Sequence, residues 1–492
     1  MQTYPLHIDG ARREPASGEY FESYDPFVGQ PWARIARGNA DDVDAAVGAA
    51  HRALTTGPWP EMTASARGKL LRCLGEAIAE RSDDLARTEV RDNGKLYAEM
   101  SAQTAYIPEW FHYYGGLCDK LEGTVVPIDK KGYFAYTTTA PVGVVAIITP
   151  WNSPLLLLTW KLAAALAAGC TVVIKPSEHT SASTLEFVAL LEDAGLPPGV
   201  VNVVTGFGAE VGGPLVDHPQ VRKVSFTGSD ATGRRIGEQA ARGVKHVSLE
   251  LGGKSPNIVF ADADLDAAVN GAVSGIFAAT GQTCIAGSRL LIQSSVHDEV
   301  VDRVVALAAT ARMGDPADPA TQVGPVTTRD QYQKVLSYID IATSEGAQLR
   351  LGGVPATRPE CGDGWFVEPT VFTGVENTSR LAQEEVFGPV LAVIPFDDEK
   401  EAIAIANDSR YGLGAGVWTS DIGRAFRMAE AIHSGTVWVN TYRAVSYMMP
   451  FGGVKDSGLG RENGIDAVGE YLETKSVWIN IGAPTGNPFV LR

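Results

Sequence analysis

An alternation of apolar strands and helices through the middle of the chain constrains its fold most strongly. Apolar runs rich in valine and isoleucine are separated by segments with helical patterning, such as 154–169 and 181–195. Strands of this kind are typical of a parallel sheet that helices cover on both faces, and their crossovers are right-handed. The pattern predicts an α/β fold with a doubly wound, Rossmann-like domain. The expected strands are 142–150, 171–178, 200–206, 221–228 and 246–253.

A second α/β pattern begins after residues 254–260. It has its own amphipathic helices, 263–279 and 294–310, and apolar strands such as 436–440. This repetition predicts a second domain. The residues whose chemistry stands out lie near the join, and clefts between domains are common ligand sites.

Composition excludes several classes of protein. The chain has 492 residues and a net charge of −17, which argues against binding to nucleic acid or to an anionic membrane. The N-terminus lacks the basic start and apolar run of a secretory signal.

The cysteines form no C-x-x-C pair, so we expect neither a metal site nor a disulfide framework, and we expect a reducing, cytoplasmic location. They are Cys73, Cys118, Cys170, Cys284 and Cys361.

One of these cysteines lies in an unusual setting. Cys284 follows the expected helix 263–279 in "TGQTCIAGSR", among small and polar residues. A buried cysteine usually behaves as a small hydrophobe. Glycines on both sides let backbone and substrate approach closely, which makes Cys284 a candidate nucleophile.

Two motifs at strand ends suit a dinucleotide. In "FTGS", Gly228 allows a tight turn and Ser229 can cap the next helix, whose free N–H groups suit a pyrophosphate. In "IKPSE", Lys175 and Glu178 face the same crevice, and Glu178 suits ribose hydroxyls and repels a 2′-phosphate. The sequence therefore favours NAD over NADP. Taken alone, "FTGS" is equally typical of an ordinary strand–helix turn, and "IKPSE" of a solvated loop.

Two further strand ends carry side chains suited to catalysis. Asn152, in "TPWN", is a neutral donor suited to an oxyanion hole, although asparagine is also a common turn former. Glu250, in "LELGGKSP", lies in an apolar strand end, where the pKa of a carboxyl rises and suits a general base. Pairing with a nearby cation is the ordinary alternative for such a glutamate.

Together these motifs resemble the aldehyde dehydrogenase superfamily. "PWNSP", "KPSE", "FTGS", "LELGGKSP", "GQTC", "EEVFGPV", "NTY" and "PFGGVKDSGLGRE" occur in that family's order over almost the whole chain. The resemblance implies Cys284 as nucleophile, Asn152 as oxyanion donor and Glu250 as base. It also implies a set of residues that bind the cofactor: Trp151, Lys175, Glu178, Gly228, Ser229, Leu251, Glu385 and Phe387.

The resemblance further implies three structural parts. These are an NAD-binding domain (1–121 and 142–250), a catalytic domain (251–452) and a small β oligomerisation element (122–141 and 470–492). The insert 122–141 is expected to be a hairpin that supports a homodimer or homotetramer. No metal is implied, and NADP remains the weaker alternative cofactor.

The implied activity is oxidation of an aldehyde to a carboxylic acid through a thioester on Cys284, which Glu250 hydrolyses with water. Relatives that transfer the acyl group to coenzyme A typically lack this glutamate, and a catalytically silent member would not need these residues together. The sequence does not name the aldehyde.

The substrate tunnel is expected near Ser153, Leu157, Trp160, Ile285, Arg443 and Val445. Arg443 is unusual in an apolar tunnel: it either faces a polar or acidic substrate or is solvated at the rim.

Overall fold

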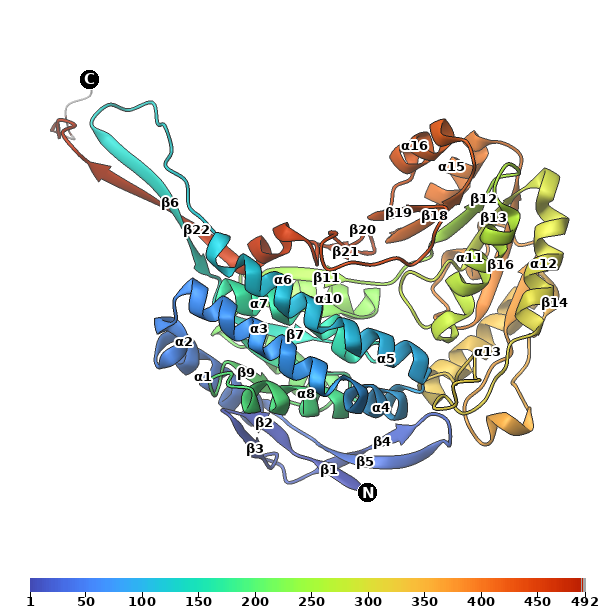
Figure 1. The fold of residues 1–492 in the computed structure, drawn as a ribbon, viewed down its shortest axis with the longest axis horizontal. Coiled ribbons are helices and arrows are strands. Elements are labelled where there is room, and N and C mark those ends of the chain that lie inside the picture. Colours follow the sequence, from blue (N-terminus) through green and yellow to red (C-terminus); the bar gives the residue numbers. More distant parts are fainter. Residues whose placement is uncertain (488, 490–492) are drawn as a thin grey trace.

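The computed structural model describes residues 1–487 and 489. Two large twisted sheets with helices on both faces form the body, and a two-stranded arm projects from it (Figure 1). This architecture confirms the predicted α/β class. Among the described residues, no helix has both the length and the apolar character needed to cross a bilayer.

The first sheet has eight strands in the order β21-β11-β10-β7-β8-β9-β2-β3. Its five central strands are parallel, and strands from the two ends of the chain extend its edges. In chain order these strands are β2 (Leu6–Ile8), β3 (Ala11–Arg13), β7 (Val144–Ile148), β8 (Thr171–Lys175), β9 (Val201–Val203), β10 (Val221–Thr227), β11 (His246–Glu250) and β21 (Gly458–Leu459). From β7 the chain passes to β8 and β9 on one side and to β10 and β11 on the other. The strand order therefore reverses between β7 and β10.

Successive residues of the central strands enter two different cores, which explains why these strands are apolar throughout. Val145 and Ile147 of β7 pack with one set of helices, whereas Ala146 and Ile148 pack with the other. The first set is α3 (Ala64–Glu80), α4 (Ser82–Asn93), α5 (Tyr97–Tyr106), α6 (Pro108–Leu117), α7 (Pro154–Ala168) and α8 (Ala182–Asp193). The second is α1 (Ala40–Thr55), α9 (Gly213–Asp217) and α10 (Asp230–Arg242). Every residue of α7 is buried, and the helix ends at Gly169 as predicted.

The second sheet has the order β14-β15-β16-β13-β12-β18-β19 and is parallel except for β14. Its strands are β12 (Pro256–Val259), β13 (Arg289–Gln293), β14 (Gln348–Leu351), β15 (Thr370–Thr373), β16 (Val390–Phe396), β18 (Gly414–Trp418) and β19 (Thr436–Val439). Its helices are α11 (Leu265–Phe277), α12 (His297–Ala309), α13 (Arg329–Ser344), α14 (Arg380–Gln383), α15 (Glu399–Asn407) and α16 (Ile422–Ala431). The first two pack on one face, and α13, α15 and α16 pack on the other.

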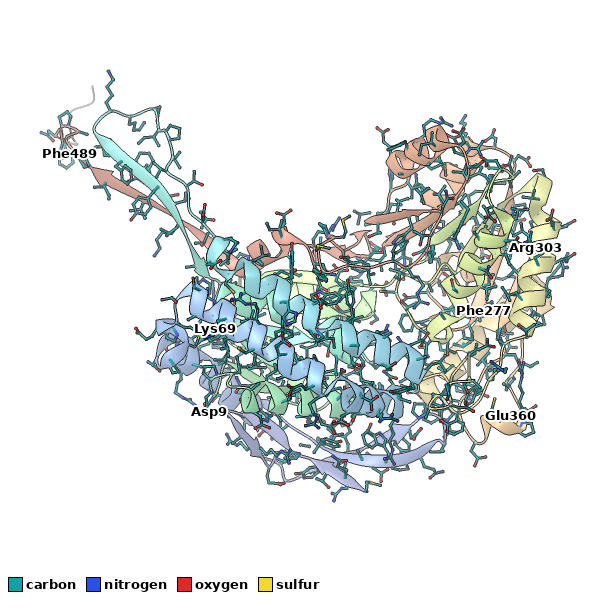
Figure 2. All side chains as sticks on the ribbon, in the orientation of Figure 1. Asp9, Lys69, Phe277, Arg303, Glu360 and Phe489 are labelled. Carbon is teal, nitrogen blue, oxygen red and sulfur yellow. The ribbon has the colours of Figure 1, made fainter. Side chains whose placement is uncertain are left out.

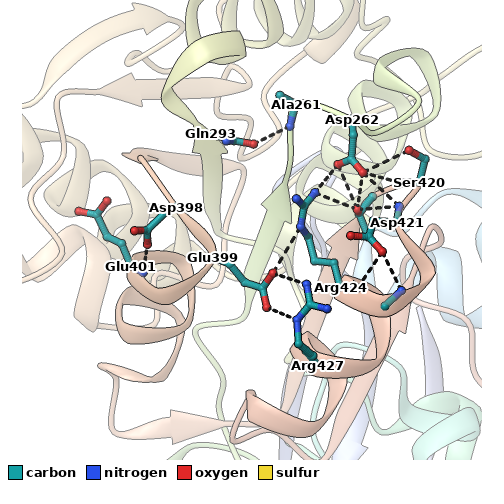
Figure 3. Close-up of polar contacts among 12 residues, drawn as sticks. Ala261, Asp262, Gln293, Asp398, Glu399, Glu401, Ser420, Asp421, Arg424 and Arg427 are labelled. Atoms are coloured by element: carbon teal, nitrogen blue, oxygen red, sulfur yellow. Dashed lines mark hydrogen bonds and ion pairs between the residues drawn. The ribbon is translucent and has the colours of Figure 1, made fainter.

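An ion-pair network fixes α15 and α16 beside β12. Arg424 and Arg427 of α16 both pair with Glu399 at the start of α15, and Arg424 also binds Asp262 just after β12 (Figure 3). Asp262 additionally accepts a hydrogen bond from the backbone N–H of Asp421, the N-cap of α16. The four side chains are 24% to 56% exposed, so the network lies at the protein surface.

The projecting arm corrects one expectation. The insert 122–141 does not form a regular hairpin: only β6 (Tyr133–Pro141) is a strand, and its opposite side contributes a single bridge, Val125 to Tyr136. Instead β6 pairs along its whole length with β22 (Leu472–Asn480). The arm leaves the body at one corner, and Phe489 lies at its tip (Figure 2).

The remaining elements are small. A three-stranded sheet combines β1 (Gln2–Tyr4), β4 (Tyr20–Asp25) and β5 (Gln30–Ala36), the short helix α2 (Pro58–Glu61) follows α1, and β17 (Tyr411–Gly412) pairs with β20 (Val454–Lys455).

All five predicted strands prove shorter than expected, 142–150 by two residues at each end and 221–228 by one residue. The strand 200–206 ends at Val203, because the chain turns away so that Thr205 can accept from the backbone N–H of Gly38. The strand 246–253 ends at Glu250, where Leu251 bonds Ser457 instead. The strand 171–178 ends at Lys175, because Pro176 has no N–H to continue the ladder.

Candidate active site

Two adjoining cavities lie where the strand order of the first sheet reverses. The larger, about 570 Å³, and the smaller, about 140 Å³, share lining residues from the loops after β7 and β10. The shared residues are Pro150, Trp151, Thr227, Gly228 and Ser229. The carboxyl ends of strands at such a switch point are the usual binding crevice of a doubly wound sheet.

The larger cavity is polar at one end. Lys175 is buried, and its ammonium donates to the carbonyl of Pro176 at 2.9 Å and to Glu178 at 3.3 Å. Burial lowers the pKa of Lys175. Burial alone would raise the pKa of Glu178, but the Lys175 charge and the backbone hold it below its usual range, so this carboxylate is charged. Gly212 lies against the Lys175 chain, where a Cβ would be 3.5 Å from Cδ.

The turn after β10 opens helix α10 toward the same cavity. A Cβ at Gly228 would lie 2.5 Å from the Phe226 ring, so the turn requires glycine. Ser229 is the N-cap of α10 and accepts from the backbone N–H of Thr232 at 3.4 Å. Ser229 and Thr232 of this first turn line the cavity, which suits the anion sites found at helix N-termini.

The smaller cavity brings together expected residues from both domains. Trp151 and Phe387 meet edge to face, with ring centroids 5.2 Å apart, and Leu251 and Leu157 also line the space. Glu385 is half-buried and accepts a hydrogen bond from the backbone N–H of Gly253 at 3.0 Å. Burial raises the pKa of Glu385.

Cys284 lines this smaller cavity and follows a strained loop. Ala279, Thr280 and Gly281 all have positive φ, at 54°, 54° and 70°. Residues with side chains rarely adopt this region, and such strain concentrates at functional sites. A Cβ at Gly281 would lie 2.1 Å from the carbonyl oxygen of Gly388, so only glycine fits there.

The surroundings of Cys284 keep its sulfur protonated. Burial raises the pKa of the thiol to about 12, and the charges of Glu385 and Glu250 act in the same direction. The backbone N–H groups of Cys284 and Ile285 oppose this rise only in part. The isolated protein therefore holds a neutral thiol here.

Asn152 also lines the cavity, from the loop after β7. Its amide donates to the carbonyl oxygen of Gln282 at 2.9 Å, two residues before Cys284. A side-chain amide thus stands beside the sulfur, fixed to the loop that carries it.

Glu250 ends β11 next to this site but does not line the cavity. It is 4% exposed, and neither carboxyl oxygen has a hydrogen-bond partner among the described residues. A Cβ at Gly452 would be 2.8 Å from its Oε1, so the carboxyl lies against a glycine. Burial and the nearby Glu462 raise the pKa of Glu250 well above its ordinary value, and the charges of Lys161 and Arg461 do not offset this.

Behind Glu250 lies a buried ion pair that sequence reasoning missed. Lys161 of α7 pairs with Glu462, and its ammonium also donates to Thr227 Oγ1 at 2.7 Å. Thr227 is the neighbour of Glu250 across the β10–β11 register. The partners are far apart in the chain, so no local pattern could have revealed them.

The expected tunnel residues form part of one aromatic cluster. Trp160 stacks on Trp110 at 6.2 Å and meets Phe451 edge to face at 5.0 Å. Leu157, Ile285 and Val445 pack in the same core, as do Tyr447 and Cys284 itself. Sequence reasoning missed Trp110 and Tyr447, whose aromatic side chains are equally typical of ordinary core.

The two remaining tunnel residues are polar. Ser153 Oγ accepts a hydrogen bond from the ammonium of Lys95 at 2.9 Å. The guanidinium of Arg443 is half-buried and donates to the carbonyl of Ser274 at 3.1 Å. Lys95 was not expected from the sequence, because one lysine in "DNGKLY" carries no distinctive spacing.

The profile of the "Aldehyde dehydrogenase family" matches residues 13–477. The chain belongs to the aldehyde dehydrogenase family. It is 46% identical to the (Z)-2-((N-methylformamido)methylene)-5-hydroxybutyrolactone dehydrogenase of Acinetobacter baylyi, with 100% of both chains covered. It is 43% identical to aldehyde dehydrogenase 1A1 of Gallus gallus, over 97% of this chain and 93% of that protein.

Solved aldehyde dehydrogenase structures share the whole fold. Betaine aldehyde dehydrogenase from Staphylococcus aureus, in complex with NAD+, superposes with a TM-score of 0.97 at 40% identity, covering 99% of this chain and 96% of that one. The NAD+ complex of an aldehyde dehydrogenase from Bacillus cereus gives 0.95 at 44% identity, covering 98% and 97%.

Proposed function

We propose that this aldehyde dehydrogenase uses NAD to oxidise an aldehyde to its carboxylic acid, with Cys284 as the nucleophile. One observation carries the proposal: Cys284 lines a cavity that continues into the crevice of a doubly wound sheet. The Cys284 thiol and the Asn152 amide therefore lie in a cavity that is connected to a crevice suited to a nucleotide.

The residues present fit NAD. Glu178, charged and held by Lys175, would accept from the adenine-ribose hydroxyls, and the start of α10 at Ser229 would hold the pyrophosphate. Glu385 would bind the second ribose, with Trp151 and Phe387 beside the nicotinamide and Leu251 against the ring. When bound, NAD supplies the chemistry of hydride acceptance. Two NAD+ complexes among the similar structures support this choice.

Cys284 supplies the covalent step. Its thiol loses its proton as the sulfur bonds to the aldehyde carbon, and the carbonyl oxygen becomes an oxyanion. Asn152 and the backbone N–H of Cys284 would donate to that oxyanion, which stabilises charge without a change of protonation in the donors. Loss of hydride from the adduct then leaves a thioester on Cys284.

Glu250 would complete the cycle. The pKa of the Glu250 carboxyl is raised, which makes its carboxylate a stronger base. This carboxylate would take a proton from water as the water attacks the thioester, and the acid and the Cys284 thiol are then released. The role requires its carboxyl to turn from Gly452 toward the sulfur, and no hydrogen bond to a described residue opposes that turn. The presence of this glutamate favours water over coenzyme A as the acceptor.

Two variants test the division of labour between these residues. Cys284→Ala should abolish oxidation and keep NAD binding, because the sulfur is the only covalent catalyst proposed. Glu250→Gln should release one NADH per active site in a burst and then turn over slowly, because only hydrolysis needs the base. Rapid-mixing absorbance at the NADH band measures both. Full steady-state activity of Cys284→Ala would overturn the proposal, and absence of the burst in Glu250→Gln would place the base before acylation.

The choice of NAD over NADP has its own test. Glu178→Ser should weaken NAD and improve NADP, because it removes the negative charge that repels a 2′-phosphate. The ratio of kcat/KM for the two cofactors reports the change. A wild-type enzyme that prefers NADP would refute the assigned role of Glu178.

We further propose that the protein works as a homodimer or homotetramer through the arm. The arm exposes large apolar side chains, Trp478 at 52% and Ile479 at 43%, and isolated two-stranded ribbons are marginal in water.

The domain division stays as proposed from the sequence: 1–121 with 142–250, 251–452, and 122–141 with 470–492. The five cysteines are unpaired, which supports a reducing, cytoplasmic location.

A further inference from the structure

Lys95 is a buried cation beside the proposed nucleophile. It lies between α4 and α5 and is 4% exposed, and among the described residues its ammonium donates one hydrogen bond, to Ser153. No described carboxylate forms an ion pair with it. The charges of two carboxylates, Glu99 and Glu89, act on Lys95, but each bonds elsewhere with one oxygen. Glu99 accepts from the backbone N–H of Ala279 at 2.7 Å and Glu89 from that of Leu155 at 2.9 Å, and the second oxygen of each has no hydrogen-bond partner among the described residues.

The position of Lys95 is fixed relative to Cys284. Asn93, two residues before Lys95, accepts at its backbone carbonyl from Thr327 Oγ1 at 2.6 Å. The backbone N–H of Thr327 donates to the side chain of Gln282 at 2.9 Å, and Gln282 is held by Asn152. A short chain of bonds therefore connects the lysine to the loop of the nucleophile.

Arg443 brings a second positive charge to the same place. It directly follows Tyr442, whose hydroxyl donates to the carbonyl of Ile285, the residue after Cys284, at 3.0 Å. Its φ of 64° is strained, and its guanidinium reaches only the carbonyl of Ser274. No described carboxylate pairs with it either. Burial lowers the pKa of Lys95 to about 8. The charge of Glu99 opposes this shift, whereas the charge of Arg443 adds to it, so the two cations interact electrostatically.

Two cations without a contacting carboxylate are costly next to an apolar pocket. A ligand carboxylate would offset that cost with charge-assisted hydrogen bonds, whereas a cationic ligand would be repelled. Ser153 directly follows Asn152, which lines the cavity of Cys284, so the hydrogen bond from Lys95 to Ser153 brings the ammonium next to that cavity. Trp110 and Trp160 stack in the apolar cluster against which Cys284 packs.

We propose that Lys95 and Arg443 bind the far end of the substrate and select aldehydes that carry a carboxylate. This inference rests on the proposed function, and it answers the question that Arg443 raised in the sequence. Lys95, which is the more buried of the two, binds the carboxylate. Arg443, which is half-exposed, attracts the carboxylate electrostatically toward Lys95.

The test compares charged and neutral aldehydes of equal length. The probes are 4-oxobutanoate, 5-oxopentanoate and 6-oxohexanoate against butanal, pentanal and hexanal, with 4-aminobutanal as the cationic probe. NADH formation gives kcat/KM for each. At the best length, wild-type enzyme should prefer the carboxylated aldehyde by about tenfold or more, as one hydrogen bond to a charged group allows. The cationic probe should be the poorest substrate.

Variants then assign the preference to the two residues. Arg443→Gln and Lys95→Met should each lower the ratio of carboxylated to neutral kcat/KM by about tenfold. Arg443→Gln tests the proposal even if the buried change at Lys95 prevents folding. Lys69→Met, on the exposed surface of α3, and Arg13→Gln, on β3, are matched controls that should keep the wild-type ratio (Figure 2).

The outcomes separate this inference from the proposed function. Wild-type enzyme that oxidises neutral aldehydes with no preference for carboxylated ones overturns the inference alone. An unchanged ratio in Arg443→Gln does the same for Arg443. Wild-type enzyme that oxidises none of the probes with NAD overturns the proposed function and this inference with it.

Discussion

Single residues in this site owe their properties to neighbours that are remote in the sequence. Cys284 is surrounded by two carboxylates from different elements, Glu385 and Glu250, and burial adds to their effect. The thiol is therefore a poor nucleophile in the free protein, and its reactivity must rise with pH. Protection of this kind limits oxidation of the Cys284 thiol, because the thiolate is the reactive form.

The pKa of Cys284 can be measured by alkylation of the protein without cofactor, in a Cys73→Ser background that removes the exposed thiol. The rate with iodoacetamide should rise about tenfold per pH unit and not level off below about pH 10, whereas an unstructured peptide with one cysteine should level off near the ordinary pKa of a thiol, about 8.5. Glu385→Gln should shift the profile to lower pH, because it removes a negative charge that opposes the thiolate. A plateau near neutral pH would contradict the deduced environment.

At the scale of elements, the buried pair Lys161–Glu462 ties helix α7 to the segment that follows β21. Both side chains are almost fully buried, at 0% and 4% exposure. Removing one partner of such a pair leaves an uncompensated buried charge, whereas replacing both with apolar side chains can be nearly neutral.

Glu462→Gln should therefore lower the free energy of unfolding by about 3–5 kcal/mol. The double variant Lys161→Met with Glu462→Leu should lower it by much less, since no charge stays behind. Urea unfolding followed by tryptophan fluorescence gives the comparison. A double variant as unstable as the single one would mean that the pair stabilises this contact by more than its desolvation costs.

The sequence predicts elements well where the pattern is local. Helix α7 and its end at Gly169, the five central strands, and the turn at Gly228 follow from apolar runs and glycines that act within a few residues. The pairing of β6 with β22 could not be predicted, because the strands are far apart in the chain. The expected apolar setting of Glu250 is correct, but Lys161, Arg461 and Glu462 reach it only through the fold. Lys95 was missed for the same reason.

At the scale of the whole molecule, the site exists only where elements of the two large sheets meet. Asn152 and Glu250 come from the carboxyl ends of strands of the first sheet, whereas Cys284 and Glu385 come from the segments that lead into β13 and β16 of the second sheet. The arm lies apart from this contact (Figure 1). Changes to the arm should therefore alter assembly before they alter chemistry.

Trp478→Asp in the arm should shift the protein toward a smaller assembly, because it places a charge in the exposed apolar surface proposed to contact another subunit. Sedimentation velocity measures the change, and Lys475→Asp on the same strand controls for added negative charge. An unchanged sedimentation coefficient in Trp478→Asp would show that assembly does not use this surface.

The antiparallel pairing of β21 with β11 matters for how the protein is made. Ribosomes release β11 long before residues 458–459 emerge, and synthesis at about 5–20 residues per second leaves that edge bare for on the order of ten seconds or longer. The unpaired N–H and C=O groups of an exposed strand edge can pair with another nascent chain on the same messenger RNA. The strand that carries Glu250 is thus the segment of this sheet for which early chaperone binding would matter most.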